Sequence, residues 1–340
     1  MERLTIDQIA KMAYVSRSVV SRVINNHSNV SDEARERVQR IVEKYNYTPN
    51  AAARSLVTSR SYEVSLLTPR KEDEVLANGF WPLLLTGITE TCNDQGYLVS
   101  LSMVSGKMKH EIRRRILSRT DFDGFIVVGQ QVSELVGTAL HRKRAASVVI
   151  GARPTWSSIS YIDAGNAYGG MLAVRHLVEL GHRRIGVITG VADSQETRDR
   201  LGGYVHALSG AHIASPRELR VEGDYSEKSG HEAMKRLLAL DNPPTAVFCM
   251  CDAMALGALL AVRESGLSVP DDISVVGYDD LPFSRYTSPP LTTIHQPVFE
   301  MGGLAATCVI DQVEGRLLAP VTRRLDVTLT VRETTAPPPK

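Results

Sequence analysis

The first sixty residues carry short apolar segments at helical spacing, separated by tight polar breaks. Ser16 precedes the second segment, and its hydroxyl can accept one of the unpaired N–H groups at a helix N-terminus. The helix behind this cap would have one apolar face and one face rich in hydrogen-bond donors. The apolar positions are Val19, Val20, Val23 and Ile24, and the polar positions are Arg17, Ser18, Ser21 and Arg22. This pattern fits a helix that enters a DNA major groove, and equally a small helical bundle with a solvated basic face.

A third helix is predicted to begin after Ser31, whose hydroxyl can cap it. Asp32 and Glu33 follow in the first turn, where the positive end of the helix dipole stabilises acidic side chains. The residues expected on its buried face are Ala34, Val38, Ile41, Val42 and Tyr45. These segments together predict a small all-α domain.

From Tyr62 onward the pattern changes, because short apolar runs now alternate with longer amphipathic stretches. The predicted strands are 64–67, 98–101, 124–128, 147–150, 184–188, 245–249, 273–277 and 325–331. Helices are expected over 169–180, 200–208, 227–240, 252–265 and 298–314. This alternation is typical of parallel sheets covered by helices, and its two series predict two doubly wound lobes.

The distribution of charge agrees with the difference between the two parts. The whole chain of 340 residues has a net charge of +1, but its first sixty residues hold ten Lys/Arg against six Asp/Glu. The basic surplus therefore lies in the helical part, as expected for a nucleic-acid interface. The four cysteines show no disulfide-framework spacing. Cys249 and Cys251 could suggest a metal site, but they lie in an apolar run without a second Cys/His pair nearby, so we interpret them as core thiols in a reducing compartment.

Several functional classes lack support in the sequence. The N-terminus does not resemble a signal peptide, and no apolar run reaches the ~20 residues of a membrane span, so a cytoplasmic location is expected. Phosphate-loop, nucleophile-elbow, dinucleotide-binding and zinc motifs are absent. We therefore expect neither an enzyme nor a resident cofactor or metal.

Several specific phrases occur in a fixed order. They are Ile9-Ala10, Val15-Ser16, Val20-Ser21-Arg22-Val23, Tyr47-Thr48-Pro49-Asn50 and Ala53-Arg54-Ser55-Leu56. In these phrases the chain resembles the lactose-repressor/galactose-repressor family of bacterial transcription regulators, and the likeness continues to about residue 331. The resemblance implies a small all-α helix-turn-helix domain followed by an α/β two-lobed, periplasmic-binding-protein-like domain with two doubly wound parallel sheets.

The expected domains follow from this likeness. A helix-turn-helix domain would cover 1–48, a hinge helix and linker 49–61, and an effector-binding and dimerisation domain 62–340. Lobe one would comprise about 62–160 and 292–321, and lobe two about 161–291 and 322–335. The chain would cross between the lobes near Ser160, Leu291 and Val321, and the end from Ala336 would be frayed.

The resemblance also implies DNA-binding residues. Arg17, Ser18 and Arg22 would face base edges in the major groove, and Arg22 could contact a guanine in bidentate fashion. Residues expected to contact the backbone are Thr5, Ser16, Ser21 and Asn25, and those of a minor-groove hinge helix are Asn50, Ala53 and Leu56. Tyr14 stands where the family often has glycine, so a positive φ there would carry strain.

A second group of candidates would line a cleft between the lobes. Phe80 and Trp81 are stacking candidates, although ordinary packing at a helix start is the alternative. Arg200, or Arg198 close by, would grip ligand oxygens, and Asp279 would accept hydrogen bonds from ligand hydroxyls. Tyr225, Cys251 and the weaker candidate Arg153 complete the expected set. Cys251 replaces a usual asparagine, Asp252 is expected to cap the next helix, and Asp280 to cap or to face solvent.

The sequence thus predicts a homodimeric regulator, most simply a repressor, that binds a palindromic operator in double-stranded DNA. A small-molecule effector, with a sugar favoured, would control that binding from the cleft. The alternative that stays open is a solute-binding module without a regulatory role. An enzyme acting on a sugar is a third hypothesis, which turnover of a bound ligand would reveal.

Overall fold

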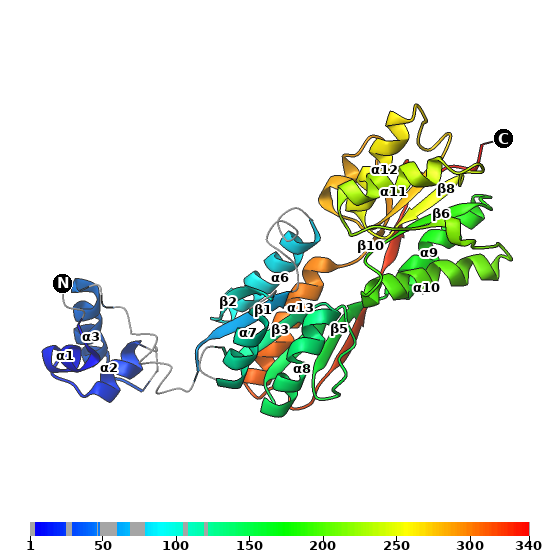
Figure 1. Cartoon of the computed structure of the whole chain (residues 1–340). Helices are drawn as coiled ribbons and strands as arrows, with labels where there is room; N and C mark the ends of the chain where they lie inside the picture. The colour runs from blue at the N-terminus through cyan, green and yellow to red at the C-terminus, as the bar shows by residue number, and fades with distance from the viewer. Residues whose placement is uncertain are drawn as a thin grey trace. The chain divides into compact units, whose positions relative to one another are not determined.

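The computed structural model describes residues 4–24, 29–45, 47, 60–68, 79–104, 108–118 and 122–339. The chain divides into two compact units, Met1–Ser61 and Tyr62–Lys340 (Figure 1). In the described ranges, no helix has both the length and the apolar character needed to cross a bilayer.

The N-terminal unit contains three helices, α1 (Ile6–Met12), α2 (Arg17–Ile24) and α3 (Asp32–Lys44). Their apolar stripes meet in a small core in which Ile9, Val20 and Val38 are fully buried. The predicted buried face of α3 is wrong at one position, because Tyr45 is 48 % exposed and Tyr47 packs against the core instead. Ser31 occupies the N-cap position, but its side chain makes no capping hydrogen bond.

The turn between α1 and α2 is closed by backbone hydrogen bonds. The Tyr14 N–H donates to the Lys11 carbonyl at 3.3 Å, and the Val15 N–H donates to the Ala10 carbonyl at 3.0 Å. This pair of bonds is a Schellman motif, which requires a left-handed residue after the helix. Tyr14 provides it with φ 55°, so the strain expected at this position is present.

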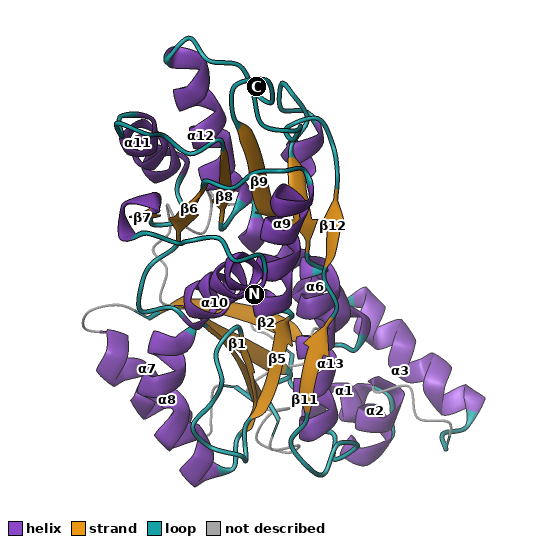
Figure 2. Ribbon diagram, turned by 90° about the vertical axis from the view of Figure 1, so that its right-hand side faces the viewer, coloured by secondary structure: helices purple, strands orange, loops and turns teal. Residues whose placement is uncertain are grey.

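The first lobe of the larger unit is a parallel six-stranded sheet in the order β11-β5-β4-β3-β1-β2. Helices cover this sheet on both sides (Figure 2). Its strands are β1 (Glu63–Thr68), β2 (Leu98–Met103), β3 (Gly124–Val128), β4 (Ala146–Ile150), β5 (Ser160–Ala164) and β11 (Thr322–Leu325). The helices α6 (Phe80–Asp94) and α13 (Val298–Val313) pack on one face, and α7 (Met108–Ser118) and α8 (Gln130–Lys143) pack on the other. Burial on both faces explains why the inner strands read as continuous apolar runs.

The second lobe repeats this architecture in the order β12-β10-β9-β8-β6-β7. Its strands are β6 (Ile185–Thr189), β7 (Arg220–Glu222), β8 (Ala246–Cys249), β9 (Ser274–Asp279), β10 (Thr292–His295) and β12 (Thr328–Thr330). Its α-helices are α9 (Asn166–Glu179), α10 (Gln195–Gly210), α11 (Glu227–Leu238) and α12 (Asp252–Glu264), with short 3-10 turns η1 (Arg217–Leu219) and η2 (Pro282–Arg285). The edge strand β12 pairs antiparallel with β10.

The sheets correct the predicted lobe boundaries. Strands β5 and β11 belong to the first sheet and β10 to the second, so the three crossings follow Ala164, His295 and Leu325. All three lie further along the chain than Ser160, Leu291 and Val321. The predicted strand 325–331 is two short strands in different sheets. Strands β5 and β11 were not predicted from the sequence, because polar or charged residues interrupt their apolar pattern.

The C-terminal segment is also ordered where we expected a frayed end. The Ala336 carbonyl accepts hydrogen bonds from His182 Nε2 at 2.9 Å and from Ser274 Oγ at 3.1 Å. Thr334 is fully buried, and its hydroxyl donates to the Val275 carbonyl at 2.6 Å. The segment through residue 339 is therefore part of the second lobe.

Candidate functional site

The exposed face of α2 carries the predicted DNA-reading side chains. Arg17, Ser18 and Arg22 are exposed, while Val20 and Val23 on the opposite side are buried. Ser16 caps the helix, because its Oγ accepts a hydrogen bond from the Val19 N–H at 3.4 Å. The face therefore presents two guanidinium groups to solvent.

The remaining DNA-binding candidates have less uniform positions. Thr5 forms a capping box with Gln8 at the start of α1, and Ser21 is half-buried. Arg17 forms an ion pair with Asp7 at 3.0 Å, and more than half of each side chain is exposed, so this pair contributes little stability. Asn25, Asn50, Ala53 and Leu56 lie outside the described residues, and their roles stay predictions.

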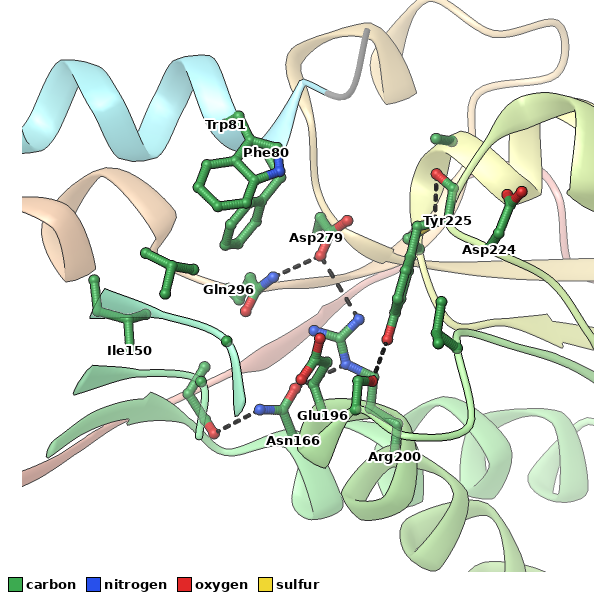
Figure 3. Close-up of a pocket in the computed structure, with 18 of the residues that line it drawn as sticks. Phe80, Trp81, Ile150, Asn166, Glu196, Arg200, Asp224, Tyr225, Asp279 and Gln296 are labelled. Carbon is green, nitrogen blue, oxygen red and sulfur yellow. Dashed lines mark hydrogen bonds and ion pairs between the residues drawn. The ribbon is translucent and has the colours of Figure 1, made fainter. Parts of the chain in front are cut away.

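The two lobes of the larger unit enclose a cavity of about 590 Å³ at the carboxyl ends of their strands. Lobe one contributes an apolar wall, formed by Phe80, Trp81, Val128, Ile150 and Met301. Lobe two contributes polar groups that include Asn166, Arg200, Tyr225 and Asp279 (Figure 3). A volume of this size with a few convergent polar groups is typical of small-molecule sites.

Phe80 and Trp81 begin α6, and both line the cavity. Their rings contact each other edge to face, with centroids 5.8 Å apart and planes at 86°. Trp81 is also part of the first-lobe core and is 6 % exposed. The stacking and packing interpretations are therefore compatible, since one ring can anchor the helix and still form the cavity wall.

Arg200 lies on the cavity floor and is 5 % exposed. Its Nε donates to Asn166 Oδ1 at 2.8 Å, and its Nη1 donates to the Met250 carbonyl at 2.5 Å. The guanidinium lies over the Tyr278 ring at 3.6 Å from the centroid. Helices α9 and α10 approach closely enough that a Cβ on Gly170 would clash with the Arg200 backbone, which fixes the origin of this side chain.

Asp279 ends β9 and contacts Arg200 at 4.0 Å. Gln296 donates from Nε2 to Asp279 Oδ1 at 2.5 Å. Burial raises the pKa of Asp279 to about 6, and the nearby Arg200 only partly offsets this effect. The residue has φ 119°, and strained backbone of this kind concentrates at functional sites.

Tyr225 forms a side wall of the cavity. Its hydroxyl lies 2.9 Å from Ser194 Oγ and 2.6 Å from Thr197 Oγ1, so the ring is fixed against the start of α10. It too has a positive φ, of 71°. The ring can therefore present a fixed apolar face to a ligand.

Cys251 lines the cavity and also caps α12, because its Sγ accepts a hydrogen bond from the Met254 N–H at 3.4 Å. The expectation that Asp252 caps this helix is wrong. Asp252 is fully buried one residue later, where Leu281 N–H and Thr293 Oγ1 donate to its carboxylate at 2.7 and 2.5 Å. The four cysteines are buried and free of disulfides, as expected for core thiols.

Two further predictions need correction. Asp280 is neither a helix cap nor exposed, because it is buried against Arg332 at 2.5 Å and His295 at 3.1 Å. Arg153 is exposed and does not line the cavity. Arg198 is exposed as well and donates to Gln130 of α8, and Arg200 rather than Arg198 lines the cavity.

Sequence reasoning missed several residues of the site. Asp163, Asn166, Glu196 and Gln296 all line the cavity, and Asn166 Nδ2 donates to Asp163 Oδ1 at 2.8 Å. Asn166 and Gln296 lie at two of the lobe crossings, which the sequence had placed elsewhere. Within the described ranges, no group of three or more His, Cys, Asp or Glu side chains is arranged to hold a metal ion.

Comparisons with known proteins match both units. The family model of bacterial regulatory proteins of the lacI family matches residues 5–50, and that of a periplasmic binding protein-like domain matches residues 174–335. The chain is 34 % identical over 316 residues to the HTH-type transcriptional repressor PurR of Aliivibrio salmonicida, covering 92 % of this chain and 93 % of that protein. It is also 34 % identical to the HTH-type transcriptional regulator CelR of Thermobifida fusca, with 97 % and 98 % covered.

Solved structures agree with these matches. The lac repressor dimer bound to operator and the anti-inducer ONPF matches with a TM-score of 0.86 and 31 % identity, over 98 % of this chain and 100 % of that chain. The complex of the transcriptional regulator CelR with cellobiose matches with a TM-score of 0.76 and 32 % identity, over the same shares. The chain therefore belongs to the lacI family of bacterial regulatory proteins and is a ligand-controlled DNA-binding transcription regulator rather than an enzyme.

Proposed function

We propose that this protein is a repressor that binds a palindromic operator as a homodimer and responds to a saccharide in the cavity between its lobes. We infer the chemical class of the ligand from the residues that line this cavity. An aromatic wall at Phe80 and Trp81 faces a floor of hydrogen-bonding groups at Asn166, Arg200 and Asp279. Saccharides combine apolar C–H faces with hydroxyl groups, so they complement both surfaces.

The relatives support this proposal. The solved CelR structure contains cellobiose, and the lac repressor structure is a dimer on its operator. In this chain the exposed face of α2 presents Arg17 and Arg22, which can bind phosphates and guanine edges. Two copies related by a two-fold axis would place two such faces on one palindrome.

The cavity has a direct structural connection to the lobe crossings. Arg200 binds Asn166 at the first crossing, and Asp279 binds Gln296 at the second. A ligand that replaces or strengthens these contacts would favour one arrangement of the lobes over another. Coupling of roughly 1–3 kcal/mol, typical of allosteric proteins, would change operator affinity about 5–150-fold. We propose release of DNA as the direction of the response.

The test combines two measurements on the full-length protein. Thermal unfolding in the presence of mono- and disaccharides identifies ligands, since one at a hundred times its Kd adds about 2.7 kcal/mol of stability. Fluorescence anisotropy with DNA from upstream of the protein's own gene then measures operator affinity with and without that saccharide. We expect operator-specific binding that falls when the saccharide is added. Saccharide binding without any operator preference would instead support a solute-binding module.

A further inference from the structure

Three of the helix N-termini at the cavity are already satisfied by side chains of the protein itself. Helices α10, α11 and α12 all begin there, and an uncapped N-terminus attracts anions. The capping atoms are Ser194 Oγ, Ser226 Oγ and Cys251 Sγ, which accept from the N–H groups of Thr197, Ser229 and Met254 at 3.2, 3.1 and 3.4 Å. The first turns also carry Glu196, Glu227 and Asp252. These three helix ends therefore attract a ligand anion less than those of α6, α8 and α9, which also begin at lining residues but have no side-chain cap.

The basic side chains that line the described part of the cavity are engaged as well. Arg200 donates to Asn166 and to the Met250 carbonyl, and its charge is balanced by Asp279 at 4.0 Å. Lys228 has a side chain that is 85 % exposed, and its Nζ lies 3.9 Å from Glu232 on the same helix. A ligand carboxylate or phosphate would therefore have to displace an existing partner of either group.

Carboxylates, by contrast, are in excess. The described lining residues include six acids, Asp163, Asp193, Glu196, Asp224, Glu227 and Asp279, and two bases, Arg200 and Lys228. Among the described residues, no basic side chain forms an ion pair with Asp193, Glu196 or Glu227. Glu196 is the half-buried member of these three, and it lies on the same side of the cavity as Arg200 and Tyr225 (Figure 3). Its charge is less screened by water than those of the two exposed acids.

We propose that this cavity selects against anionic ligands and binds a saccharide that carries an amino group more tightly than its neutral counterpart, with Glu196 as the specificity-determining side chain. This inference rests on the proposed saccharide-binding function. An ammonium group in the cavity can form a charge-assisted hydrogen bond with Glu196. A carboxylate placed in the same position meets this negative charge, and the nearby cation, Arg200, is already balanced by Asp279 at 4.0 Å.

Isothermal titration calorimetry of the full-length protein tests this preference with two matched series of ligands. The first series is glucose, glucosamine and glucuronate. The second is cellobiose, the β-1,4-linked disaccharide of two glucosamine units, and cellobionate. In whichever series binds, we expect the anionic ligand to have an affinity roughly tenfold or more below that of the neutral ligand. The reason is that two like charges placed close together cost more than the about 1.4 kcal/mol that corresponds to a tenfold change in affinity. The amino member should bind most tightly, and high salt should reduce both differences.

Glu196→Gln removes the charge and retains the size of the side chain. In this variant the affinities of the amino and neutral members should converge, and the anionic member should bind more tightly than it does to the wild type. Glu300→Gln is the matched control, because Glu300 also lies in the first turn of a helix, is exposed, and does not line the cavity. It should leave all affinities unchanged.

Distinct results separate the inference from the function on which it rests. If a saccharide binds but its anionic analogue binds equally well, or if Glu196→Gln leaves the ratios unchanged, the charge selection is refuted and the saccharide site stands. If no member of either series binds, the saccharide class is refuted and the inference is refuted with it.

Discussion

Replacing Asp279 with asparagine should make the protein more stable and less able to bind its ligand. The pKa of Asp279 lies at about 6 because burial raises it above its usual value of 3.8, against the smaller opposing effect of Arg200. Between pH 3.8 and about pH 6, Asp279 of the folded protein holds a proton that the same residue has released in the unfolded chain. Stability due to this group is therefore complete below about pH 4 and is lost as the pH rises through about 6.

The magnitude follows from the size of this shift. About two pKa units, at about 1.4 kcal/mol each, correspond to an upper value of about 3 kcal/mol. The neutral amide of the variant would resemble the protonated acid at every pH, so Asp279→Asn should raise the free energy of unfolding by up to that amount at pH 8. Arg200 would keep its contacts with Asn166, the Met250 carbonyl and the Tyr278 ring. Ligand affinity should fall, because the variant loses an ionised acceptor on the cavity floor.

Urea unfolding of the wild type and the variant at pH 5 and pH 8 measures this effect. The neighbouring Asp280→Asn provides a control of opposite sign. Burial alone would raise the pKa of Asp280, but hydrogen bonds and charge from Arg332 and His295 outweigh this effect and lower the pKa below its usual value. The ionised form of Asp280 therefore stabilises the fold. Asp280→Asn should therefore lower stability at pH 8. If Asp279→Asn were destabilising at pH 8, or if its effect were equal at both pH values, the interpretation of Asp279 as an unfavourably buried functional acid would be wrong.

Three further results are expected. Arg22→Ala should reduce discrimination between operator and random DNA by about 1–3 kcal/mol in anisotropy titrations. Stabilisation of this variant by the saccharide should be retained. Arg40→Ala, on α3, is the control, and a similar loss of discrimination in it would argue against base readout by Arg22. Tyr14→Gly should stabilise the N-terminal unit by roughly 1 kcal/mol in calorimetry by relieving the left-handed strain at φ 55°, and an unchanged transition would contradict that strain. Burial lowers the pKa of His182 from its usual 6.5, so wild-type stability should decline as the pH falls below about 6.5. In urea titrations His182→Gln should flatten this decline, and an equally steep slope would assign it to other groups.

The fold was predictable where it depends on local periodicity. The continuous apolar runs at Gly124–Val128 and Ala246–Cys249 identify strands that are buried on both faces. Periodicity failed at β5 and β11, where Asp163 and Arg323 replace apolar residues. Since β5 and β11 precede two of the three lobe crossings, errors in these two short segments displaced two of the lobe boundaries.

The candidate site was predictable in part. Phe80, Trp81, Arg200, Tyr225, Cys251 and Asp279 follow from motif positions, and all of them line the cavity. Asn166 and Gln296 could not be found in this way, because their partners are distant in the sequence and only the folded topology brings them together. The burial of Asp280 likewise depends on Arg332, which reaches it from beyond the last strand.

These long-range contacts also indicate where ligand binding and lobe arrangement are coupled. A chain of polar contacts runs from Asp163 through Asn166, Arg200 and Asp279 to Gln296. Its two ends lie at separate crossings, and its centre lies on the cavity floor. A ligand that competes for Arg200 or Asp279 therefore changes the hydrogen bonds of both crossings at once. In a low-dielectric interior, polar groups left without partners are costly, so the lobes should favour discrete arrangements in which every member of the chain is satisfied.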